Sequence, residues 1–268
     1  MNNGLLPTDE TGHMTITSGE TTGQEVVLLP GERLDDLQRD GLRIIQNPKW
    51  FSFGMDAVLL SAFASADTGD RCIDLCTGNG VIPLLMSSRT PAGHFDGLEI
   101  MEDIAEMAMR SVRYNHLEER INIRAGDVRE AVSIYGASTF QVVTVNPPYL
   151  TENGGLINPD DHKAIARHEL RLNLREMLET SVGLLEPGGH FFMVHRPFRM
   201  AEILHEMIIA GIEPKRLRMV HPFHDREPNM LLVEGVRGGN SGMVVDRPLI
   251  IYKDKGVYTE EVEKLYYE

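Results

Sequence analysis

The sequence predicts an α/β protein built on a doubly wound, mostly parallel seven-stranded sheet that ends in an antiparallel hairpin. From Cys72 onward, short apolar runs of strand length alternate with segments whose apolar residues recur at helical spacing. A glycine-rich turn, Gly78-Asn79-Gly80, follows the first of these runs. The last two apolar runs have no helical segment between them. Repeated strand–helix units favour parallel strands joined by right-handed crossovers, and the final pair favours a hairpin.

Length and composition exclude several classes of protein. The chain has 268 residues, enough for one large domain with a substantial core. Its apolar fraction of 42% and charged fraction of 25% are typical of soluble globular proteins. No apolar run approaches the ~18 residues of a membrane span, and the N-terminus lacks a secretory signal segment. We therefore expect a cytoplasmic protein without a membrane partner.

Composition and periodicity divide the chain into four segments. In chain order we expect a flexible leader, a small N-terminal hairpin, the main domain and a C-terminal appendage, over residues 1–25, 26–54, 55–238 and 239–268. The leader is rich in Thr, Gly, Ser and Glu and shows no periodicity. The hairpin is expected to pair strands at residues 26–29 and 43–46. The appendage is expected to contain a short strand at residues 249–252.

The main domain is expected to begin with a helix over residues 55–66, because apolar residues such as Leu59 and Ala62 recur at helical spacing. The seven strands are expected over residues 71–75, 97–100, 121–124, 140–145, 191–195, 217–221 and 230–236. The helices between them are expected over residues 81–88, 104–117, 170–185 and 200–210. Glu186-Pro187-Gly188-Gly189 is expected to stop the third of these helices. Ligands of such sheets bind beyond the carboxyl ends of the strands.

The only two cysteines, Cys72 and Cys76, lie four positions apart on either side of Asp74. A zinc site needs a second pair of ligands that this spacing does not supply. A disulfide is not expected in a reducing compartment. We therefore expect no metal centre and two small, buried cysteine side chains.

The charge of the chain is unevenly distributed. A net charge of −14 argues against tight nonspecific binding of nucleic acid. Between His162 and Arg226, however, ten Lys and Arg residues face eight acids, which leaves this window at +2 and the rest near −16. Two interpretations stay open: a basic face on an acidic protein, or an ordinary solvated helix surface.

Asn146-Pro147-Pro148-Tyr149 follows the apolar run at residues 142–145, where an expected strand ends. Each proline fixes φ near −65° and removes a backbone donor, so the strand stops and the turn is stiff. The side-chain carbonyl of Asn146 and the backbone carbonyl of Pro147 can then converge on one planar amino group. The Tyr149 ring can stack on the molecule that carries this amine. The alternative is a stiff loop between a strand and a helix.

Asp74-Leu75-Cys76-Thr77-Gly78-Asn79-Gly80 forms the turn after the first strand of the sheet. Gly78 and Gly80 allow the backbone to turn tightly and approach a ligand. A dinucleotide-binding fingerprint would need a further glycine three residues after Gly80, where this chain has Pro83. Asp74 would repel a pyrophosphate and suits a ligand with a cationic amino group.

Two more acids follow neighbouring strands. Glu99 ends the second strand, where a carboxylate can accept from both hydroxyl groups of a ribose. Asp127 follows the third strand and can accept from an adenine amino group. Together with Asp74, they describe a pocket for an adenosine that bears a cationic amino acid, which is S-adenosylmethionine. Taken singly, each acid is better explained as a cap or turn residue.

The glycine turn, Glu99, Asp127 and the Asn-Pro-Pro-Tyr motif together resemble the class I methyltransferases, Rossmann-like enzymes that modify planar amino groups. Within this class the chain is most similar to bacterial tRNA adenine-N6 methyltransferases that act on the anticodon loop of a valine tRNA. The closer resemblance rests on Phe53-Gly54-Met55-Asp56-Ala57-Val58-Leu59-Leu60 and on His195-Arg196-Pro197, and it covers roughly residues 28–236. The motif alone is shared with rRNA guanine-N2, DNA adenine and release-factor glutamine methyltransferases.

The resemblance implies transfer of a methyl group from S-adenosylmethionine to the N6 amine of an unpaired adenine in the anticodon stem-loop of a tRNA. A protein glutamine amide or a guanine N2 in rRNA are alternative acceptors. The implied catalytic residues are Asn146, Pro147, Pro148 and Tyr149. The implied cofactor residues are Asp56, Asp74, Cys76, Gly78, Gly80, Glu99, Asp127 and Asn146. The candidate RNA contacts are Tyr149, Lys163, Arg167, Arg171, Arg196 and Arg199. Asp56 is implied to orient the methionine end of the cofactor, with a charge at a helix N-terminus as the alternative.

Overall fold

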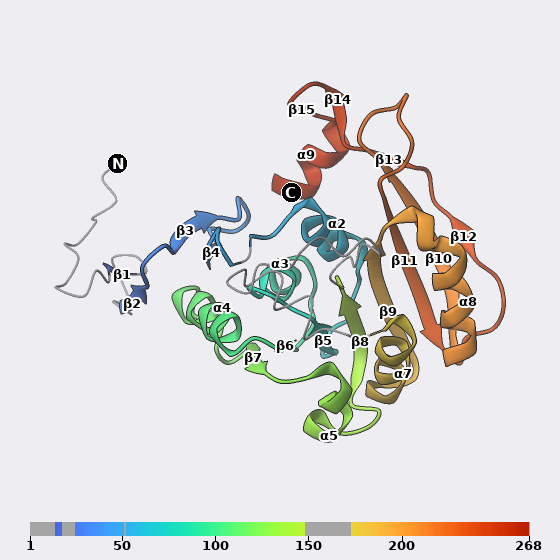
Figure 1. The fold of residues 1–268 in the computed structure, drawn as a ribbon, viewed down its shortest axis with the longest axis horizontal. Coiled ribbons are helices and arrows are strands. Elements are labelled where there is room, and N and C mark those ends of the chain that lie inside the picture. The colour runs from blue at the N-terminus through green and yellow to red at the C-terminus, as the bar shows by residue number, and fades with distance from the viewer. Residues whose placement is uncertain (1–13, 18–24, 51, 148–172, 268) are drawn as a thin grey trace, which may run out of the picture.

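The computed structural model describes residues 14–17, 25–50, 52–147 and 173–267 of the 268-residue chain. A central sheet with helices on both faces makes up most of the described chain (Figure 1). Its strands are β5 (Arg71–Leu75), β6 (His94–Glu99), β7 (Ile121–Ala125), β8 (Phe140–Val145), β9 (Leu185–His195), β10 (Ile212–His221), β11 (Met230–Arg237), β12 (Val244–Val245) and β13 (Leu249–Ile250).

The strands lie in the order β12-β10-β11-β9-β8-β5-β6-β7, and β13 also pairs with β10. Strands β7, β6, β5, β8 and β9 are parallel, whereas β11 runs antiparallel to both β9 and β10. The chain moves from β5 outward to β7 and then crosses back to β8, so the topological switch point lies between β5 and β8. This order confirms the predicted doubly wound sheet with an antiparallel end, and β12 and β13 extend it beyond the seven predicted strands.

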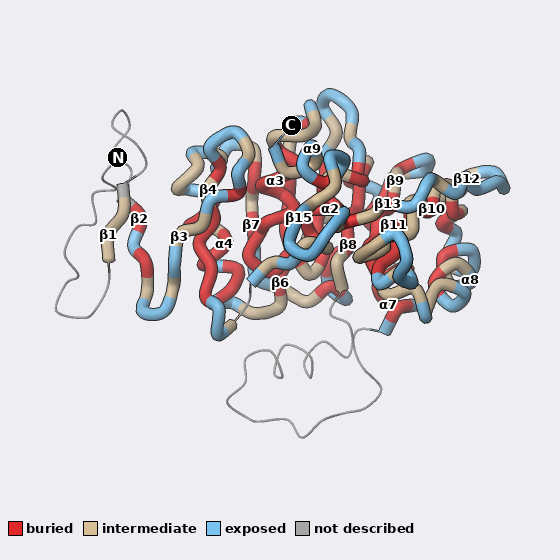
Figure 2. Tube along the Cα trace, turned by 90° about the horizontal axis from the view of Figure 1, so that it is seen from above, coloured by how far each residue is buried: buried red, intermediate tan, exposed pale blue. Residues whose placement is uncertain are grey.

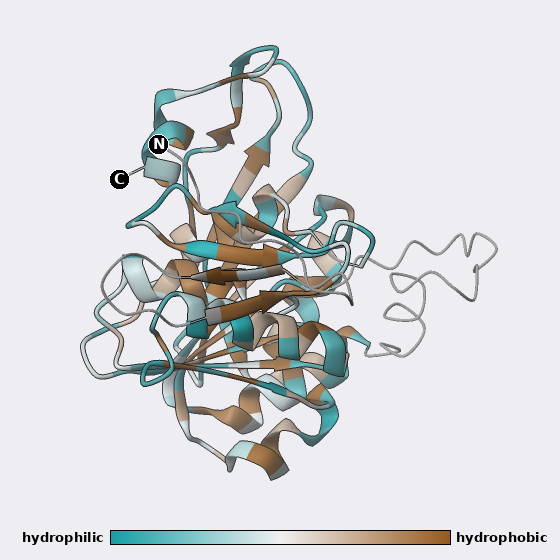
Figure 3. Ribbon diagram, turned by 90° about the vertical axis from the view of Figure 1, so that its left-hand side faces the viewer, coloured by the Kyte–Doolittle hydropathy of each residue, from teal (hydrophilic) through white to brown (hydrophobic). Residues whose placement is uncertain are grey.

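The sheet is buried on both faces, which explains the nearly continuous apolar runs of the sequence. Cys72 and Val142 belong to one core, and their strand neighbours Ile73 and Val143 belong to the other. The first core is covered by α2 (Met55–Phe63), α3 (Val81–Arg89) and α4 (Glu102–Tyr114). The second is covered by α5 (Ala131–Tyr135), α7 (Leu174–Leu184) and α8 (Met200–Ala210). Figure 2 shows the buried segments gathered along the sheet, and Figure 3 shows the hydrophobic strands between the helical layers.

The N-terminal strands pair differently from the expected hairpin. They are β1 (Met14–Thr17), β2 (Glu25–Leu28), β3 (Arg33–Asp36) and β4 (Arg43–Gln46). β1 pairs with β2 and β3 pairs with β4, so the expected pairing of residues 26–29 with 43–46 is wrong. The loop between β3 and β4 places Gln38 and Asp40 at positive φ, which lets these two neighbouring strands close directly on each other. Residues 14–17, inside the expected leader, form a strand.

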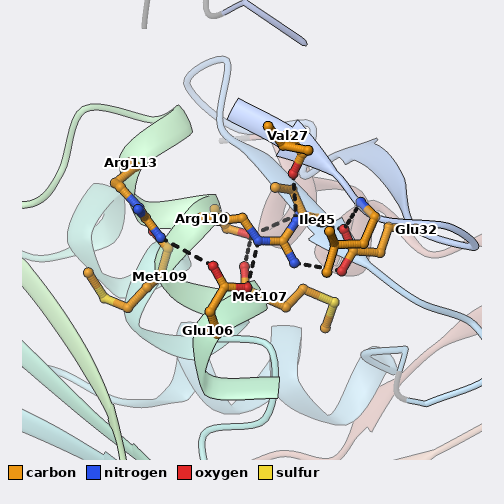
Figure 4. Close-up of polar contacts among 10 residues, drawn as sticks. Val27, Glu32, Ile45, Glu106, Met107, Met109, Arg110 and Arg113 are labelled. Carbon is orange, nitrogen blue, oxygen red and sulfur yellow. Dashed lines mark hydrogen bonds and ion pairs between the residues drawn. The ribbon is translucent and has the colours of Figure 1, made fainter. Parts of the chain in front are cut away.

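Arg110 on α4 attaches the segment that follows β2 to the helical layer (Figure 4). Its guanidinium donates to both carboxylate oxygens of Glu32 at 2.6 Å and to the Val27 carbonyl at 2.7 Å. Its Nε donates to Glu106 at 2.7 Å. The side chains of Arg110 and Glu32 are 7% and 0% exposed. A buried bidentate pair therefore fixes the N-terminal extension on α4.

Helix α7 begins at Leu174 behind a capping box formed by Asn173 and Glu176. Residues 170–172 of the expected helix lie outside the described residues. The helix ends at Leu184, directly before the predicted stop. The next strand begins earlier than expected, because β9 starts at Leu185 and includes Pro187-Gly188-Gly189 at a shift in its register with β8. Glycine at position 188 allows this, since the backbone there has a φ of +85°.

The C-terminal residues continue the fold. The short strands β12 and β13 lengthen the sheet, and a small hairpin joins β14 (Tyr252–Asp254) to β15 (Val257–Tyr258). The last helix, α9 (Glu260–Tyr267), buries Val262 in the core beneath α2. Within the described ranges, none of the helices combines the length and the apolar character needed to cross a bilayer.

Candidate active site

The carboxyl ends of the five parallel strands meet at one edge of the sheet. Leu75 on β5 lies opposite Leu98 on β6 and Val145 on β8. The pairings of β6 with β7 and of β8 with β9 keep the remaining ends at a similar level. The residues that follow these ends are therefore brought together. In order along the edge they are Asp127, Glu99, the turn at residues 76–80, Asn146 and Arg196.

The turn after β5 contains three residues with positive φ angles. Cys76, Gly78 and Gly80 have φ angles of +59°, +56° and +78°. A positive φ is uncommon for a residue with a side chain, so Cys76 is the costly member of this set. Gly80 precedes α3, and a Cβ at this position would lie 3.3 Å from the Cβ of Ala108. Glycine is therefore needed at position 80 both for the φ angle and for close packing of α4.

Asp74 is a buried carboxylate at the end of β5, 3% exposed. Its Oδ1 accepts a hydrogen bond from the Thr144 hydroxyl on β8 at 2.6 Å, whereas Oδ2 has no partner among the described residues. Burial raises the pKa of Asp74 to about 7. The nearby hydroxyl groups of Thr144 and Thr77 act against burial and lower the pKa of Asp74. Of these two, only Thr144 forms a hydrogen bond with Asp74.

Asn79 lies in the same turn and is completely buried, with 0% exposure. Its Nδ2 donates to the Gln46 side chain at 3.5 Å, and its Oδ1 has no partner within the described part of the chain. Because Gln46 ends β4, this contact joins the N-terminal hairpin to the turn. Three buried polar atoms without a partner among the described residues thus come from one short segment: Asp74 Oδ2, Thr77 Oγ1 and Asn79 Oδ1. Sequence reasoning singled out only the first.

Glu99 ends β6 and is 6% exposed. Its Oε2 accepts from the Gly78 N–H at 2.9 Å and its Oε1 from the Met101 N–H at 3.1 Å. Burial raises the pKa of Glu99, against these stabilising backbone bonds. A carboxylate can accept about four hydrogen bonds, so two backbone contacts leave capacity for ligand hydroxyl groups.

Asp127 forms an ion pair with Arg129, a residue that was not among the predicted site residues. It precedes η1 (Val128–Glu130), accepts from the Arg129 N–H at 2.9 Å and forms an ion pair with the Arg129 guanidinium. The hydrogen bond from Arg129 lowers the pKa of Asp127. An adenine amino group would share this carboxylate with Arg129, so the predicted adenine contact stays a prediction.

The structure assigns Cys76 and Asp56 local roles, and their cofactor contacts stay predictions. Burial raises the pKa of Cys76 well above the ordinary thiol value, which keeps it neutral and unreactive. Asp56 lies in the first turn of α2, and its Oδ1 accepts from the Ala57 N–H at 3.0 Å. A Cβ on residue 54 would lie 2.6 Å from this Oδ1, so glycine at that position makes room for the carboxylate.

Asn146 and Pro147 follow β8 directly, and both are half-buried. The register pairs Val145 with Leu75, so Asn146 follows β8 at the level where the glycine turn follows the neighbouring strand β5. The other members of the predicted motif and the first basic group lie outside the described residues: Pro148, Tyr149, Lys163, Arg167 and Arg171.

Arg196 and Arg199 follow β9 at the same edge. Arg196 Nη1 donates to the Asn229 carbonyl at 3.0 Å, and Arg199 Nε donates to Glu202 at 2.7 Å. The residue before Arg196, His195, is 3% exposed. Its burial, and to a smaller extent the positive charge of nearby Arg199, lowers the pKa of His195 to about 4. Its Nδ1 accepts from the Arg196 N–H at 2.7 Å, so the neutral ring carries its proton on Nε2. His195 therefore orients the start of this segment.

Residues 51–211 match the model of the family described as "Methyltransferase small domain". The chain belongs to this family. It is 29% identical over 223 residues to a tRNA1(Val) (adenine(37)-N6)-methyltransferase of Porphyromonas gingivalis, covering 79% of this chain and 86% of the relative. It is 31% identical over 182 residues to a protein of the same name in Parabacteroides distasonis, covering 68% and 75%. These matches confirm the family resemblance inferred from the motifs.

Solved structures show that this methyltransferase shares its fold with other methyltransferases. The match to a crystal structure of a predicted O-methyltransferase from Agrobacterium tumefaciens has a TM-score of 0.64 at 23% identity, covering 79% of this chain and 95% of that one. The match to geranyl diphosphate methyltransferase in complex with SAM has a TM-score of 0.51 at 13% identity, covering 68% and 84%.

The site of this methyltransferase fits S-adenosylmethionine. Asp74 Oδ2 is a buried acceptor without a partner in the described ranges, in a position that a cationic group would satisfy. Glu99 is fixed at the neighbouring strand end with acceptor capacity left for ribose hydroxyl groups. The predicted cofactor therefore agrees with the chemistry of these two positions.

Proposed function

We propose that this methyltransferase transfers the methyl group of S-adenosylmethionine to the N6 amine of an unpaired adenine in tRNA. One observation carries the proposal. Asn146 and Pro147 lie at the end of β8, one strand from the turn that would hold the methyl donor. The relatives named as tRNA1(Val) (adenine(37)-N6)-methyltransferases support adenine in tRNA as the acceptor. A tRNA substrate fits a cytoplasmic enzyme.

The residues after β8 overcome the poor nucleophilicity of the adenine amine, whose lone pair is delocalised into the ring. Asn146 Oδ1 and the Pro147 carbonyl accept its two hydrogens, so the nitrogen becomes pyramidal and its lone pair points toward the donor. Bound S-adenosylmethionine supplies an electrophilic methyl group and a neutral thioether leaving group. The two carbonyls act by position and charge, and no general base is needed, because the nitrogen releases its proton after the new bond forms.

Labelled S-adenosylmethionine and total RNA from cells that lack this enzyme test the proposal by nucleoside analysis. We expect label in N6-methyladenosine of the tRNA fraction. RNA from cells that retain the enzyme is the matched control, because its site is already methylated and should accept little label. Label in N2-methylguanosine of rRNA, or in protein alone, would replace the proposed acceptor by one of the alternatives.

A further inference from the structure

An exposed aromatic residue lies at the carboxyl edge beside the proposed acceptor site. Phe198 belongs to η2 (Pro197–Arg199), which follows the end of β9. β9 is parallel to β8, and Val145 pairs with Met193, so the segment after β9 emerges at the same edge as Asn146. Adjacent strands lie about 4.8 Å apart. Phe198 is therefore within the reach of an RNA loop whose adenine is held by Asn146.

Phe198 is more exposed than any other large apolar residue in the described chain, at 78% against 63% for Val244. A single exposed apolar residue is ordinary in itself. What distinguishes Phe198 is its setting. An arginine stands two positions before it and another directly after it, in the sequence Arg196-Pro197-Phe198-Arg199.

The two arginines that flank Phe198 in the sequence are each held by a hydrogen bond. Arg196 donates to the Asn229 carbonyl in the connection between β10 and β11. Arg199 pairs with Glu202 and is 26% exposed. These contacts anchor both guanidinium groups in the segment that exposes the Phe198 ring. Cationic groups that track phosphates, combined with an aromatic face for a base, form the usual binding surface for unpaired nucleic acid.

The same segment fits a protein partner poorly. Stable protein interfaces bury about 800 Å² on each side around an apolar centre. The neighbours of Phe198 are a half-buried proline, two arginines and, after Met200, an exposed alanine and an exposed Glu202. Along residues 196–202, one exposed ring stands among charged and small side chains, which suits stacking on a base better than an apolar protein interface.

We propose that Phe198 stacks on an unpaired nucleobase next to the modified adenine and so positions the tRNA loop for methyl transfer. This inference rests on the proposed function and adds a contact to it. Asn146 and Pro147 bind the amine that reacts, whereas Phe198, one strand further out, holds a neighbouring nucleotide. Phe198 is thus a positioning residue, whose loss weakens RNA binding and leaves the chemical step intact.

Phe198→Ala, Phe198→Trp and Ile209→Ala test this role in steady-state methylation of the tRNA. Ile209 is the matched control, because it is 61% exposed and lies in the last turn of α8. Loss of one base-stacking contact predicts a KM for tRNA raised roughly tenfold, with kcat within about twofold of wild type. Phe198→Trp should restore the wild-type KM, and Ile209→Ala should leave it unchanged. All three variants should keep the wild-type melting temperature.

A stem-loop RNA with 2-aminopurine beside the target adenine reports stacking directly. Wild-type protein should quench its fluorescence on binding, and Phe198→Ala should quench it much less. If wild-type protein methylates tRNA but Phe198→Ala matches it in KM and quenching, the stacking role is wrong and the proposed function stands. If wild-type protein transfers no methyl group to tRNA, the proposed function fails and this inference fails with it.

Discussion

Asp74 places a negative charge in a buried position, and this charge makes a ligand-free protein sensitive to pH. Burial raises the pKa of its carboxyl to about 7, compared with ~3.9 in an unfolded chain. Between these two values the folded protein binds more protons than the unfolded chain, so its free energy of unfolding falls as pH rises from about 4 to about 7. Above about pH 7 this carboxylate is ionised, and a bound cation would neutralise its charge.

We predict that the affinity for S-adenosylmethionine rises with pH between about 5.5 and 7, by up to tenfold per pH unit, and then levels off. A cationic amino group favours ionised Asp74, so binding below pH 7 must expel a proton. Calorimetric titrations at several pH values measure this. Asp74→Asn should bind weakly with a flat profile.

Asp127→Asn is the control for this titration, because the Arg129 hydrogen bond lowers the pKa of Asp127 and keeps it ionised across the same range. That variant should retain the wild-type slope. A flat wild-type profile would show that Asp74 does not face the cofactor amine.

Residue patterns indicated the acids at the strand ends but not their partners. Asp74 and Glu99 could be assigned because each follows an apolar run. The Thr144 hydroxyl that bonds to Asp74 comes from a strand 70 positions away, and only the sheet register brings the two together. Thr144 is a polar residue within the run Val142–Val145, which is a signal that could have identified it. The ion pair of Asp127 with Arg129 joins residues only two positions apart. It was not predicted, because no periodic pattern marks such a pair in the sequence.

At the scale of elements, the end of β9 is predicted to receive RNA phosphates. Arg196→Glu should weaken tRNA binding and reduce the slope of log affinity against log salt by about one. The slope falls because binding that lacks one phosphate contact releases fewer counterions from the RNA. Lys255→Glu is the control, since it makes the same charge change in the exposed turn between β14 and β15. Binding isotherms at several salt concentrations measure the slope. An unchanged slope in Arg196→Glu would remove this residue from the interface.

The repeated strands and helices were predictable because their apolar residues recur with clear periods. Of the N-terminal strands, β2 and β4 were expected, whereas β1 and β3 were not. Met14–Thr17 alternates threonine with apolar residues inside a polar segment, and its role is evident only from its pairing with β2. The segment Pro187-Gly188-Gly189 was expected to lie between a helix and the next strand. It lies inside β9 instead, at a register shift between Leu185 and His190, which both pair with β8, and no local pattern shows this.

At the scale of the whole molecule, the buried pair of Arg110 and Glu32 joins the N-terminal extension to helix α4. We predict that Arg110→Met lowers the free energy of unfolding by about 3–5 kcal/mol, because it leaves Glu32 buried without its charged partner. Replacing Glu32 by Gln in the same chain should recover most of this loss. Urea unfolding measures both effects.

Arg113→Met provides the comparison for this pair. Arg113 contacts Glu106 at 3.4 Å with side chains that are 45% and 49% exposed, so its removal should cost less than about 1 kcal/mol. Equal losses for Arg110→Met and Arg113→Met would show that the buried pair does not hold the extension in place.

The central claim is that Asn146 activates the acceptor amine beside a separately bound methyl donor. Asn146→Ala, assayed for methyl transfer to tRNA and for S-adenosylmethionine binding by calorimetry, tests it most directly. Asn122→Ala, on β7 away from the carboxyl edge, is the control and should behave as wild type. We predict that Asn146→Ala transfers methyl groups at least about 10²–10³-fold more slowly and binds the donor within about threefold of wild type. Undiminished transfer, or loss of donor binding in step with transfer, would contradict the account.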